Sequence, residues 1–358
     1  MNIRMTIRPF YYSFISAIIL SIYQNNDSDD SHQDIIRRSK TLKKLFVLLV
    51  TLVLCTSAIV GCSPSNKTGS TTLSQSTTSA SGWVSQKNPG YYQGLEFGSV
   101  WGTSSSDVFA VGRQGTIIHY NGKAWSTMTS GTTDDILGIW GSSSSDVYTS
   151  GYTGTILHYN GKTWSPMVSN SPVIFTRIWG SSPSDIFAVA TLGAIQHYDG
   201  KTWSGMTISV PVNWFYDVWG TSSSDVFAVG AGGTILHYDG NTWSSMTSGT
   251  TNALEGIWGS SPSDVFALGI GGTILHYDGN TWSSITSGTT AQLTGIWGDS
   301  PSDIFVVGIG GIVLHYDGNA WSSLPTGTTT DFSCVWGSSS SDVFAGGVDG
   351  TIWHYSGN

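Results

Sequence analysis

The sequence predicts an all-β protein, a seven-bladed β-propeller of four-stranded antiparallel blades. Three observations support this prediction: a repeat of nearly constant period, four short apolar runs in each repeat, and a last repeat that stops before its fourth run. A Trp-Gly pair recurs every 39 or 40 residues, which is the repeat length of a propeller blade. The tryptophans of these pairs are Trp101, Trp140, Trp179, Trp219, Trp258, Trp297 and Trp336.

Each repeat contains four segments with the composition of β-strands. In the fifth copy they span residues 254–258, 264–269, 273–277 and 281–285, and they are rich in Val, Ile, Phe, Tyr and Trp. Ser, Gly, Asp and Asn separate them, as turn residues separate strands. The Asp278-Gly279 pair predicts a tight hairpin between the last two segments. Since no apolar pattern runs far enough between these breakers to form a helix, the repeat is a sheet.

The two ends of the repeat region complement each other. The seventh copy ends at Asn358 without the second tryptophan that follows the His-Tyr pair in the other six copies. Trp83, before the first copy, supplies the missing residue, although Gln86 stands where other copies have Met, Ile or Leu. Closing a ring of sheets removes their open edges. We therefore predict that an N-terminal strand completes the C-terminal blade.

The third and fourth segments carry a family resemblance. The stretch His276–Trp282, HYDGNTW, resembles the Asp-box of BNR-repeat propellers, with His where that motif begins with Ser. From Trp83 onward the chain is similar to bacterial BNR/Asp-box-like (YVTN/WD40-like) propeller lipoproteins. The resemblance implies the propeller fold, but sialidases, sortilin-type receptors and photosystem II assembly factors share such blades. It therefore implies no single activity.

The N-terminal region has the features of an export signal. Basic residues between 37 and 44 precede an apolar run over residues 45–60, and Gly61-Cys62 follows. This end resembles the bacterial lipobox, which implies a lipid on Cys62, a membrane anchor and an exported envelope protein. Ser63 after the cysteine resembles the pattern of outer-membrane lipoproteins. An uncleaved transmembrane anchor is the alternative, although 16 apolar residues are short for a span.

Three regions follow from this pattern. Residues 1–61 are a leader, of which the first 36 have no assigned role, and residues 62–81 are a Ser/Thr-rich tether. Residues 82–358 form the seven-bladed propeller. The tether composition predicts a flexible link between the lipid anchor and the ring.

The charge and the cysteines exclude several classes of protein. From Cys62 onward there are seven Lys and Arg residues against 19 Asp and Glu residues, a formal net charge of −12. This charge opposes binding of the ring to nucleic acid or to an anionic membrane surface. Cys334 has no partner within the ring, so disulfides do not stabilise the fold. We expect a monomer without a cofactor.

One His and one Asp recur in every repeat, which argues against catalysis. Equivalent positions of a ring lie too far apart to converge on one ion or one substrate. We expect each His to satisfy a buried polar group, each Asp to accept backbone N–H groups in its turn, and the repeated Trp residues to pack between blades. No catalytic residue and no metal site is predicted.

The differences between repeats locate a candidate binding face. The loops from the fourth segment of one copy to the first of the next vary, and so do the turns from the second to the third segment. In a four-stranded blade these two sets emerge on the same face. The single 40-residue step between Trp-Gly pairs falls at the loop over residues 207–217, beside Trp214. The distinctive residues of this face are Tyr91, Tyr92, Arg113, Asp134, Asp135, Tyr152, Arg177, Trp214, Tyr216, Asp217 and Asp349.

The sequence favours a non-enzymatic, envelope-anchored propeller that holds a protein or a glycan on this face. One alternative is a BNR-type glycoside hydrolase or lyase. A sialidase clamps its substrate with three arginines, whereas the ring has two, and the carboxylates available to another glycosidase are Asp134, Asp135, Asp217, Glu255 and Asp349. The other alternative is a lectin with one sugar site per blade, which requires exposed, repeated Trp side chains.

Overall fold

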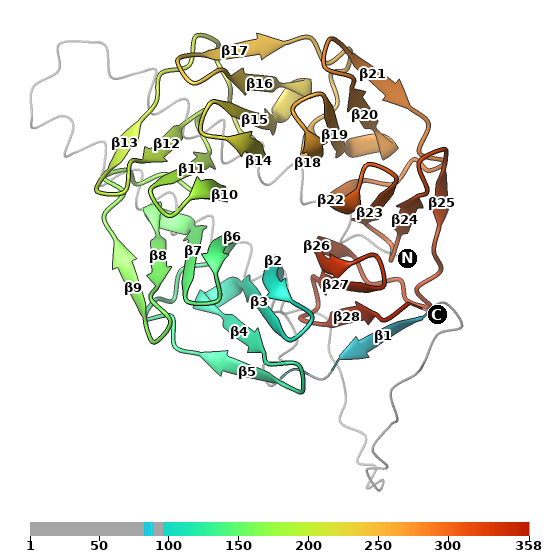
Figure 1. Cartoon of the computed structure of the whole chain (residues 1–358), viewed down its shortest axis with the longest axis horizontal. Coiled ribbons are helices and arrows are strands. Elements are labelled where there is room, and N and C mark those ends of the chain that lie inside the picture. The colour runs from blue at the N-terminus through green and yellow to red at the C-terminus, as the bar shows by residue number, and fades with distance from the viewer. Residues whose placement is uncertain (1–81, 87, 89–95, 358) are drawn as a thin grey trace, which may run out of the picture. The chain divides into compact units, whose positions relative to one another are not determined.

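The computed structural model describes residues 82–86, 88 and 96–357. These residues form seven four-stranded antiparallel sheets around a central axis (Figure 1). The predicted all-β, seven-bladed propeller is therefore confirmed. None of the helical turns in this part of the chain has the length and apolar character that a membrane crossing requires.

Strands in equivalent positions have nearly equal lengths. The innermost strands are β2 (Phe97–Ser104), β6 (Ile136–Ser143), β10 (Phe175–Ser182), β14 (Phe215–Ser222), β18 (Leu254–Ser261), β22 (Leu293–Ser300) and β26 (Phe332–Ser339). The second strands are β3 (Asp107–Gly112), β7 (Asp146–Gly151), β11 (Asp185–Ala190), β15 (Asp225–Gly230), β19 (Asp264–Gly269), β23 (Asp303–Gly308) and β27 (Asp342–Gly347).

The outer half of each blade is shorter. The third strands are β4 (Ile117–Tyr120), β8 (Ile156–Tyr159), β12 (Ile195–Tyr198), β16 (Ile235–Tyr238), β20 (Ile274–Tyr277), β24 (Val313–Tyr316) and β28 (Ile352–Tyr355). The outermost strands are β5 (Trp125–Met128), β9 (Trp164–Met167), β13 (Trp203–Gly205), β17 (Trp243–Met246), β21 (Trp282–Ile285), β25 (Trp321–Ser323) and β1 (Trp83–Gln86). Single 3-10 turns follow four second strands: η2 (Arg113–Gly115), η3 (Tyr152–Gly154), η4 (Ala231–Gly233) and η5 (Ile270–Gly272).

The seventh blade takes its outermost strand from the N-terminal segment. β1 pairs antiparallel with β28, and Trp83 lies opposite Tyr355 with their rings 5.4 Å apart. Gln86 Oε1 accepts a 2.7 Å hydrogen bond from the Trp125 indole of the first blade. At the equivalent place between the third and fourth blades, the sulfur of Met206 accepts a hydrogen bond from the Trp243 indole. The Gln in place of Met therefore keeps the same contact with the next blade.

The core lies between successive blades, and the Trp-Gly pair explains how they interlock. A Cβ atom on Gly220 would lie 2.9 Å from the Trp179 indole of the preceding blade, and all seven Trp-Gly pairs repeat this contact. The second tryptophan of the repeat packs in the opposite direction. Trp243, for example, meets Phe187 of the preceding blade edge-on, with ring centroids 6.3 Å apart. Both repeated tryptophans therefore stabilise contacts between blades, as the sequence predicts.

A β-bulge shapes each innermost strand. In β14 the pairing steps from Phe215 to Asp217, and in β18 from Leu254 to Gly256, so that one residue is left out of the ladder each time. The extra residues are Tyr216 and Glu255. A bulge redirects the side chain that it carries, so these two positions are set apart from the regular ladder.

Candidate binding face

The variable loops and turns form one continuous rim. The backbone N–H of Ala231, in η4, donates to the carbonyl of Trp214 at 2.9 Å, and the N–H of Leu192 donates to the carbonyl of Asn213 at 2.8 Å. Each second-to-third-strand turn is thus tied to a loop that joins two blades. We call this side of the ring the variable face and the opposite side, with its repeated Ser-rich loops, the constant face.

The large apolar side chains that the described residues expose all lie on the variable face. Among the described residues, three large apolar side chains are exposed, and all three lie on this face: Val168 at 76%, Leu192 at 52% and Ile270 at 43%. Val168 belongs to the loop before β10, and the other two lie at the tips of turns. Because all three lie on one of the two faces, the variable face is the candidate interaction surface.

Strained backbone gathers on the same face. The described non-glycine residues with φ between +53° and +59° are Gln114, Thr153, Asn170 and Leu192. This left-handed conformation costs a non-glycine residue about 1 kcal/mol. Gln114, Thr153 and Leu192 are the middle residues of the turns between the second and third strands. In three later blades this position is occupied by Gly232, Gly271 and Gly310. Because strain of this kind collects at functional sites, the side chains in the first three blades suggest a role beyond the turn itself.

Six residues from blades 3 to 6 gather where the innermost strands meet the variable face. We call them the axial cluster: Arg177, Trp214, Tyr216, Asp217, Glu255 and Gln292. The rings of Trp214 and Tyr216 are stacked, with centroids 6.1 Å apart and planes 20° from parallel. All six side chains are partly exposed. The structure thus brings together four of the predicted site residues with two that the prediction did not select for this face.

Arg177 and Asp217 satisfy each other and the surrounding backbone. Arg177 Nε lies 3.8 Å from Asp217 Oδ1, and Nη1 donates to the carbonyls of Leu137 and Thr176. The Asp217 carboxylate accepts the N–H groups of Val218 at 2.9 Å and Ile257 at 3.0 Å. Desolvation raises the pKa of Asp217 to about 6 against the opposing effects of Arg177 and these N–H groups. The Arg177–Asp217 pair therefore links the backbones of neighbouring blades.

Glu255 is held differently. Both of its carboxylate oxygens accept from one amide nitrogen, Gln292 Nε2, at 2.7 and 2.8 Å. Burial raises the pKa of Glu255, while Gln292 and Arg177 oppose the shift. Burial also raises the pKa of Tyr216, and the negative charge of Glu255 adds to this effect. The Tyr216 hydroxyl and the Glu255 carboxylate therefore influence each other electrostatically.

The predicted residues of blades 1 and 2 lie elsewhere on the rim and organise loops. Arg113 forms an ion pair with Glu96 at 2.8 Å. Asp135 accepts the N–H of Gln114 at 2.9 Å. The hydroxyls of Thr153 and Thr155 donate to Asp134 and lower its pKa.

The remaining predicted residues complete this comparison. Tyr152 is half-buried at the start of η3. Asp349 accepts hydrogen bonds from the Thr351 hydroxyl at 2.5 Å and the Thr330 hydroxyl at 3.1 Å. Tyr91, Tyr92 and Cys62 lie outside the described residues.

The structure adds residues that the comparison of repeats did not name as distinctive for this face. Glu255 was predicted only as a possible glycosidase carboxylate, and Gln292 carried no distinctive signal. Leu192, Val168 and Ile270 lie in loops and turns whose exposure cannot be read from their composition. The signal of Leu192 in the sequence is a large apolar residue where other repeats have Gln, Thr, Gly or Asp, whereas Ile270 has apolar equivalents in Ile309 and Val348.

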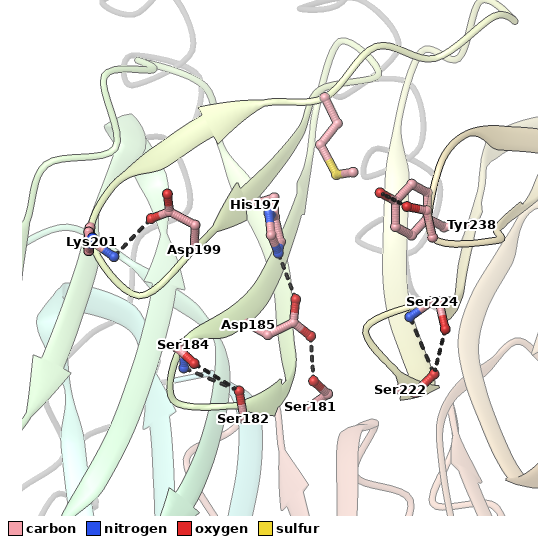
Figure 2. A network of polar contacts seen from close by, with 12 residues as sticks. Ser181, Ser182, Ser184, Asp185, His197, Asp199, Lys201, Ser222, Ser224 and Tyr238 are labelled. Carbon is pink, nitrogen blue, oxygen red and sulfur yellow. Dashed lines mark hydrogen bonds and ion pairs between the residues drawn. The ribbon is translucent and has the colours of Figure 1, made fainter.

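The repeated His and Asp form one polar network per blade toward the constant face (Figure 2). In blade 3 the His197 Nε2 lies 2.7 Å from Asp185 Oδ1, and the Ser181 hydroxyl donates to the other carboxylate oxygen. The His–Asp contact recurs in all seven blades at 2.6–2.7 Å. The predicted structural role of His is confirmed, but the predicted backbone partner of Asp was wrong, because His and Ser or Thr side chains take its place.

Two further site types are not supported in the described part of the chain. The second tryptophans of five blades, such as Trp203 and Trp243, are at most 8% exposed. The tryptophans of the Trp-Gly pairs are partly exposed, but each packs against the Gly of the next blade. Residues 82–86, 88 and 96–357 contain no group of His, Cys, Asp and Glu side chains that could hold a metal ion.

Solved structures share this fold. The sequence matches no protein-family model and no curated protein. A structure of YCF48 bound to D1 peptide matches with a TM-score of 0.65 and 15% identity, covering 77% of this chain and 97% of that one. YCF48 from Cyanidioschyzon merolae matches with a TM-score of 0.63 and 14% identity, covering 76% of this chain and 98% of that one. The WD40 propeller domain of Doa1 matches with a TM-score of 0.63 and 13% identity, covering 75% of this chain and 94% of that one. The chain is thus similar to WD40- and YCF48-type propellers in fold.

Proposed function

We propose that this protein is a non-enzymatic binding propeller that holds a polypeptide partner on its variable face. The observation that carries the proposal is that the large apolar side chains exposed by the described residues all lie on that face. The strained residues of the same rim, Thr153 and Leu192 among them, support it. A binding protein needs a rigid ring that positions adaptable loops, and the seven interlocked blades provide that framework.

The structural neighbours support a polypeptide over a glycan. One of the similar structures is YCF48 bound to D1 peptide. At 15% identity this likeness is one of fold, so peptide binding by the present chain is our proposal. The packing of the repeated tryptophans between blades also disfavours a sugar site in each blade.

We further propose that the ring is displayed on the cell envelope. The lipobox-like Gly61-Cys62 and the preceding apolar run support export and lipid attachment, as in BNR/Asp-box-like propeller lipoproteins. A Cys62→Ser variant should lose incorporation of radiolabelled palmitate and move from the membrane fraction to the soluble fraction. Unchanged labelling of that variant would remove Cys62 as the anchor.

A loop exchange tests the binding proposal. Residues 207–214 are replaced by the shorter loop of the next blade, residues 247–253, and the immobilised full chain is exposed to capped, randomised nonapeptides. Because the exchange removes Trp214 while keeping a loop that this ring already accommodates, retention should fall by about tenfold or more. A matched control on the constant face, Asn280→Lys, copies the turn of blade 3 and should leave retention unchanged.

Equal retention by the loop exchange and the control would show that this loop is not the binding surface. Retention of oligosaccharides on a glycan array, with no retention of peptides, would replace the polypeptide by a glycan.

One observation favours the glycosidase alternative enough to test it. Asp217 and Glu255 both have raised pKa values, and a protonated carboxyl is what a general acid requires. The Asp217 oxygens, however, are occupied by backbone N–H groups. Hydrolysis of 4-nitrophenyl glycosides by the full chain, lost in Glu255→Gln, would establish the enzyme; we expect no hydrolysis.

A further inference from the structure

The axial cluster carries more negative than positive charge. It contains two carboxylates, Asp217 and Glu255, and one guanidinium, Arg177, which lies 3.8 Å from Asp217. The Arg177 charge is further engaged by two backbone carbonyls. Among the described residues, Glu255 receives hydrogen bonds only from the neutral amide of Gln292. Arg177 lowers the pKa of Glu255 electrostatically but donates it no hydrogen bond. A partly buried carboxylate that shares one guanidinium with a second carboxylate is costly, and a cation supplied from outside would relieve that cost.

Aromatic rings accompany this carboxylate. Tyr216 and Glu255 are the bulge residues of neighbouring innermost strands, and Trp214 stacks on Tyr216 with a centroid distance of 6.1 Å. An ammonium or guanidinium group binds favourably over such rings. The backbone of Leu192, whose side chain is 52% exposed, is hydrogen-bonded to Asn213 next to Trp214, so the turn beside this loop exposes an apolar side chain. Carboxylate, aromatic rings and apolar surface together match the chemistry of a Lys or Arg side chain.

The blade architecture does not require these residues. Tyr216 and Glu255 occupy the position that is Gly98, Leu137, Thr176, Thr294 or Ser333 in the other blades. Three of these, Thr176, Thr294 and Ser333, use a hydroxyl to bridge to the next blade. Blades 1, 2, 4 and 5 have no hydroxyl at this position, but only blades 4 and 5 place an aromatic or a charged side chain there, which favours a role in binding over one in packing.

The variable face around the axial cluster carries a net negative charge. The described residues of the variable face with charged side chains are Glu96, Asp134, Asp135, Asp217, Glu255, Asp331 and Asp349, against Arg113 and Arg177. Such a surface attracts a basic segment and repels an acidic one.

We propose that the axial cluster binds the Lys or Arg side chain of a partner polypeptide, with Glu255 pairing with the positive charge and Trp214 and Tyr216 contacting the rest of the side chain. This inference rests on the proposed function, because it names the chemical group that the bound polypeptide contributes. Gln292 is a positioning residue, since it holds both oxygens of Glu255.

The test uses capped nonapeptide pools that are randomised except at the centre, where each pool carries Lys, Arg, norleucine or Glu. Norleucine has the apolar stem of Lys without its charge. The immobilised full chain should retain the Lys and Arg pools about tenfold more than the norleucine pool, with the Glu pool lowest. Glu255→Gln should bring the Lys, Arg and norleucine pools to similar retention.

A matched control removes one negative charge from the constant face. Asp239 accepts the N–H groups of Asn241 and Thr242 at 2.8 Å, and Asn121 makes the same turn in blade 1 at 3.0 Å. Asp239→Asn should therefore fold normally and keep the preference for cations. If Glu255→Gln does not fold, Glu255→Thr serves in its place, because Thr176 and Thr294 stand at that position in other blades.

The outcomes separate the two proposals. Retention of all pools without a preference for Lys and Arg, or a preference that survives in the Glu255 variants, overturns the cation site and leaves the binding function standing. If the native chain retains no pool, both proposals are wrong.

Discussion

Blade 2 carries two buried hydroxyl groups where other blades have apolar residues or glycine. Thr149 and Ser150 are 0% exposed, and their hydroxyl oxygens have no hydrogen-bond partner among the described residues. The equivalents of Thr149 are Ala in five blades and Val306 in the sixth. An unpaired buried hydroxyl lowers stability, so we expect these two residues to make blade 2 less stable than its neighbours.

We expect Thr149→Val to raise the free energy of unfolding by about 1–2 kcal/mol, because it replaces an unpaired hydroxyl with a methyl group of the same shape. Thr176→Val is the matched control. The Thr176 hydroxyl donates to the carbonyls of Val189 at 3.0 Å and Phe215 at 2.9 Å, so its removal should destabilise the protein. Urea unfolding measures both changes; a loss of stability in Thr149→Val would show that its hydroxyl has a partner.

Asp217 should make stability depend on pH. Desolvation raises its pKa in the folded protein to about 6, above the value of about 4 for an unfolded Asp. The folded state therefore binds the proton more tightly, and the stability from this group is complete below pH 4 and is lost as the pH rises through 6. Because the side chain is 19% exposed, we expect a loss of about 2 kcal/mol. Urea unfolding at pH 4 and pH 7 should show this loss of stability in the native chain and not in Asp217→Asn. The same pH dependence of stability in both proteins would contradict the prediction.

At the scale of the element, the Trp-Gly pair fixes how one innermost strand meets the next. A Cβ on Gly220 would lie 2.5 Å from the carbonyl oxygen of Asp225 and 2.9 Å from Trp179. Both distances are shorter than van der Waals contact, so the strand or the indole would have to move. The pair therefore recurs because each Gly makes room for the preceding Trp.

Gly220→Ala should consequently destabilise the protein by about 1–3 kcal/mol through overpacking. In Gly205→Ala, the nearest neighbour of the new Cβ would be Gln196 Nε2 at 3.6 Å, which is ordinary contact. Thermal unfolding should show a lower midpoint for the first variant and little change for the second. Equal midpoints would mean that blade spacing is not set by this contact.

Sequence periodicity predicted the elements well and the site only in part. Residues such as Trp219 and His237 repeat, and their spacing alone determines the blades. Tyr216 and Glu255 do not repeat, and their proximity depends on bulges in two separate strands. The role of Gln292 follows only from its contact with Glu255. Strand packing across blades brings such residues together, and no periodic signal in the chain encodes it.

At the scale of the whole molecule, the account depends on the ring being closed by its own N-terminal segment. Trp83 is 0% exposed and belongs to the hydrophobic cluster that contains Phe305 and Val343. Loss of a buried Trp side chain costs about 3–5 kcal/mol. An open seventh blade would leave the edge of β28 unpaired. The arrangement of loops on the variable face depends on this closure, because every loop is tied to its neighbours.

Hydrogen exchange of β28 tests this claim most directly. Residues 82–86 are replaced by a Gly/Ser segment of equal length, and amide exchange is followed by mass spectrometry in the native chain and the variant. We predict that the amides of Ile352–Tyr355 are protected in the native chain and exchange much faster in the variant, with a lower unfolding midpoint. Equal protection of β28 in both proteins would contradict closure by the N-terminal strand.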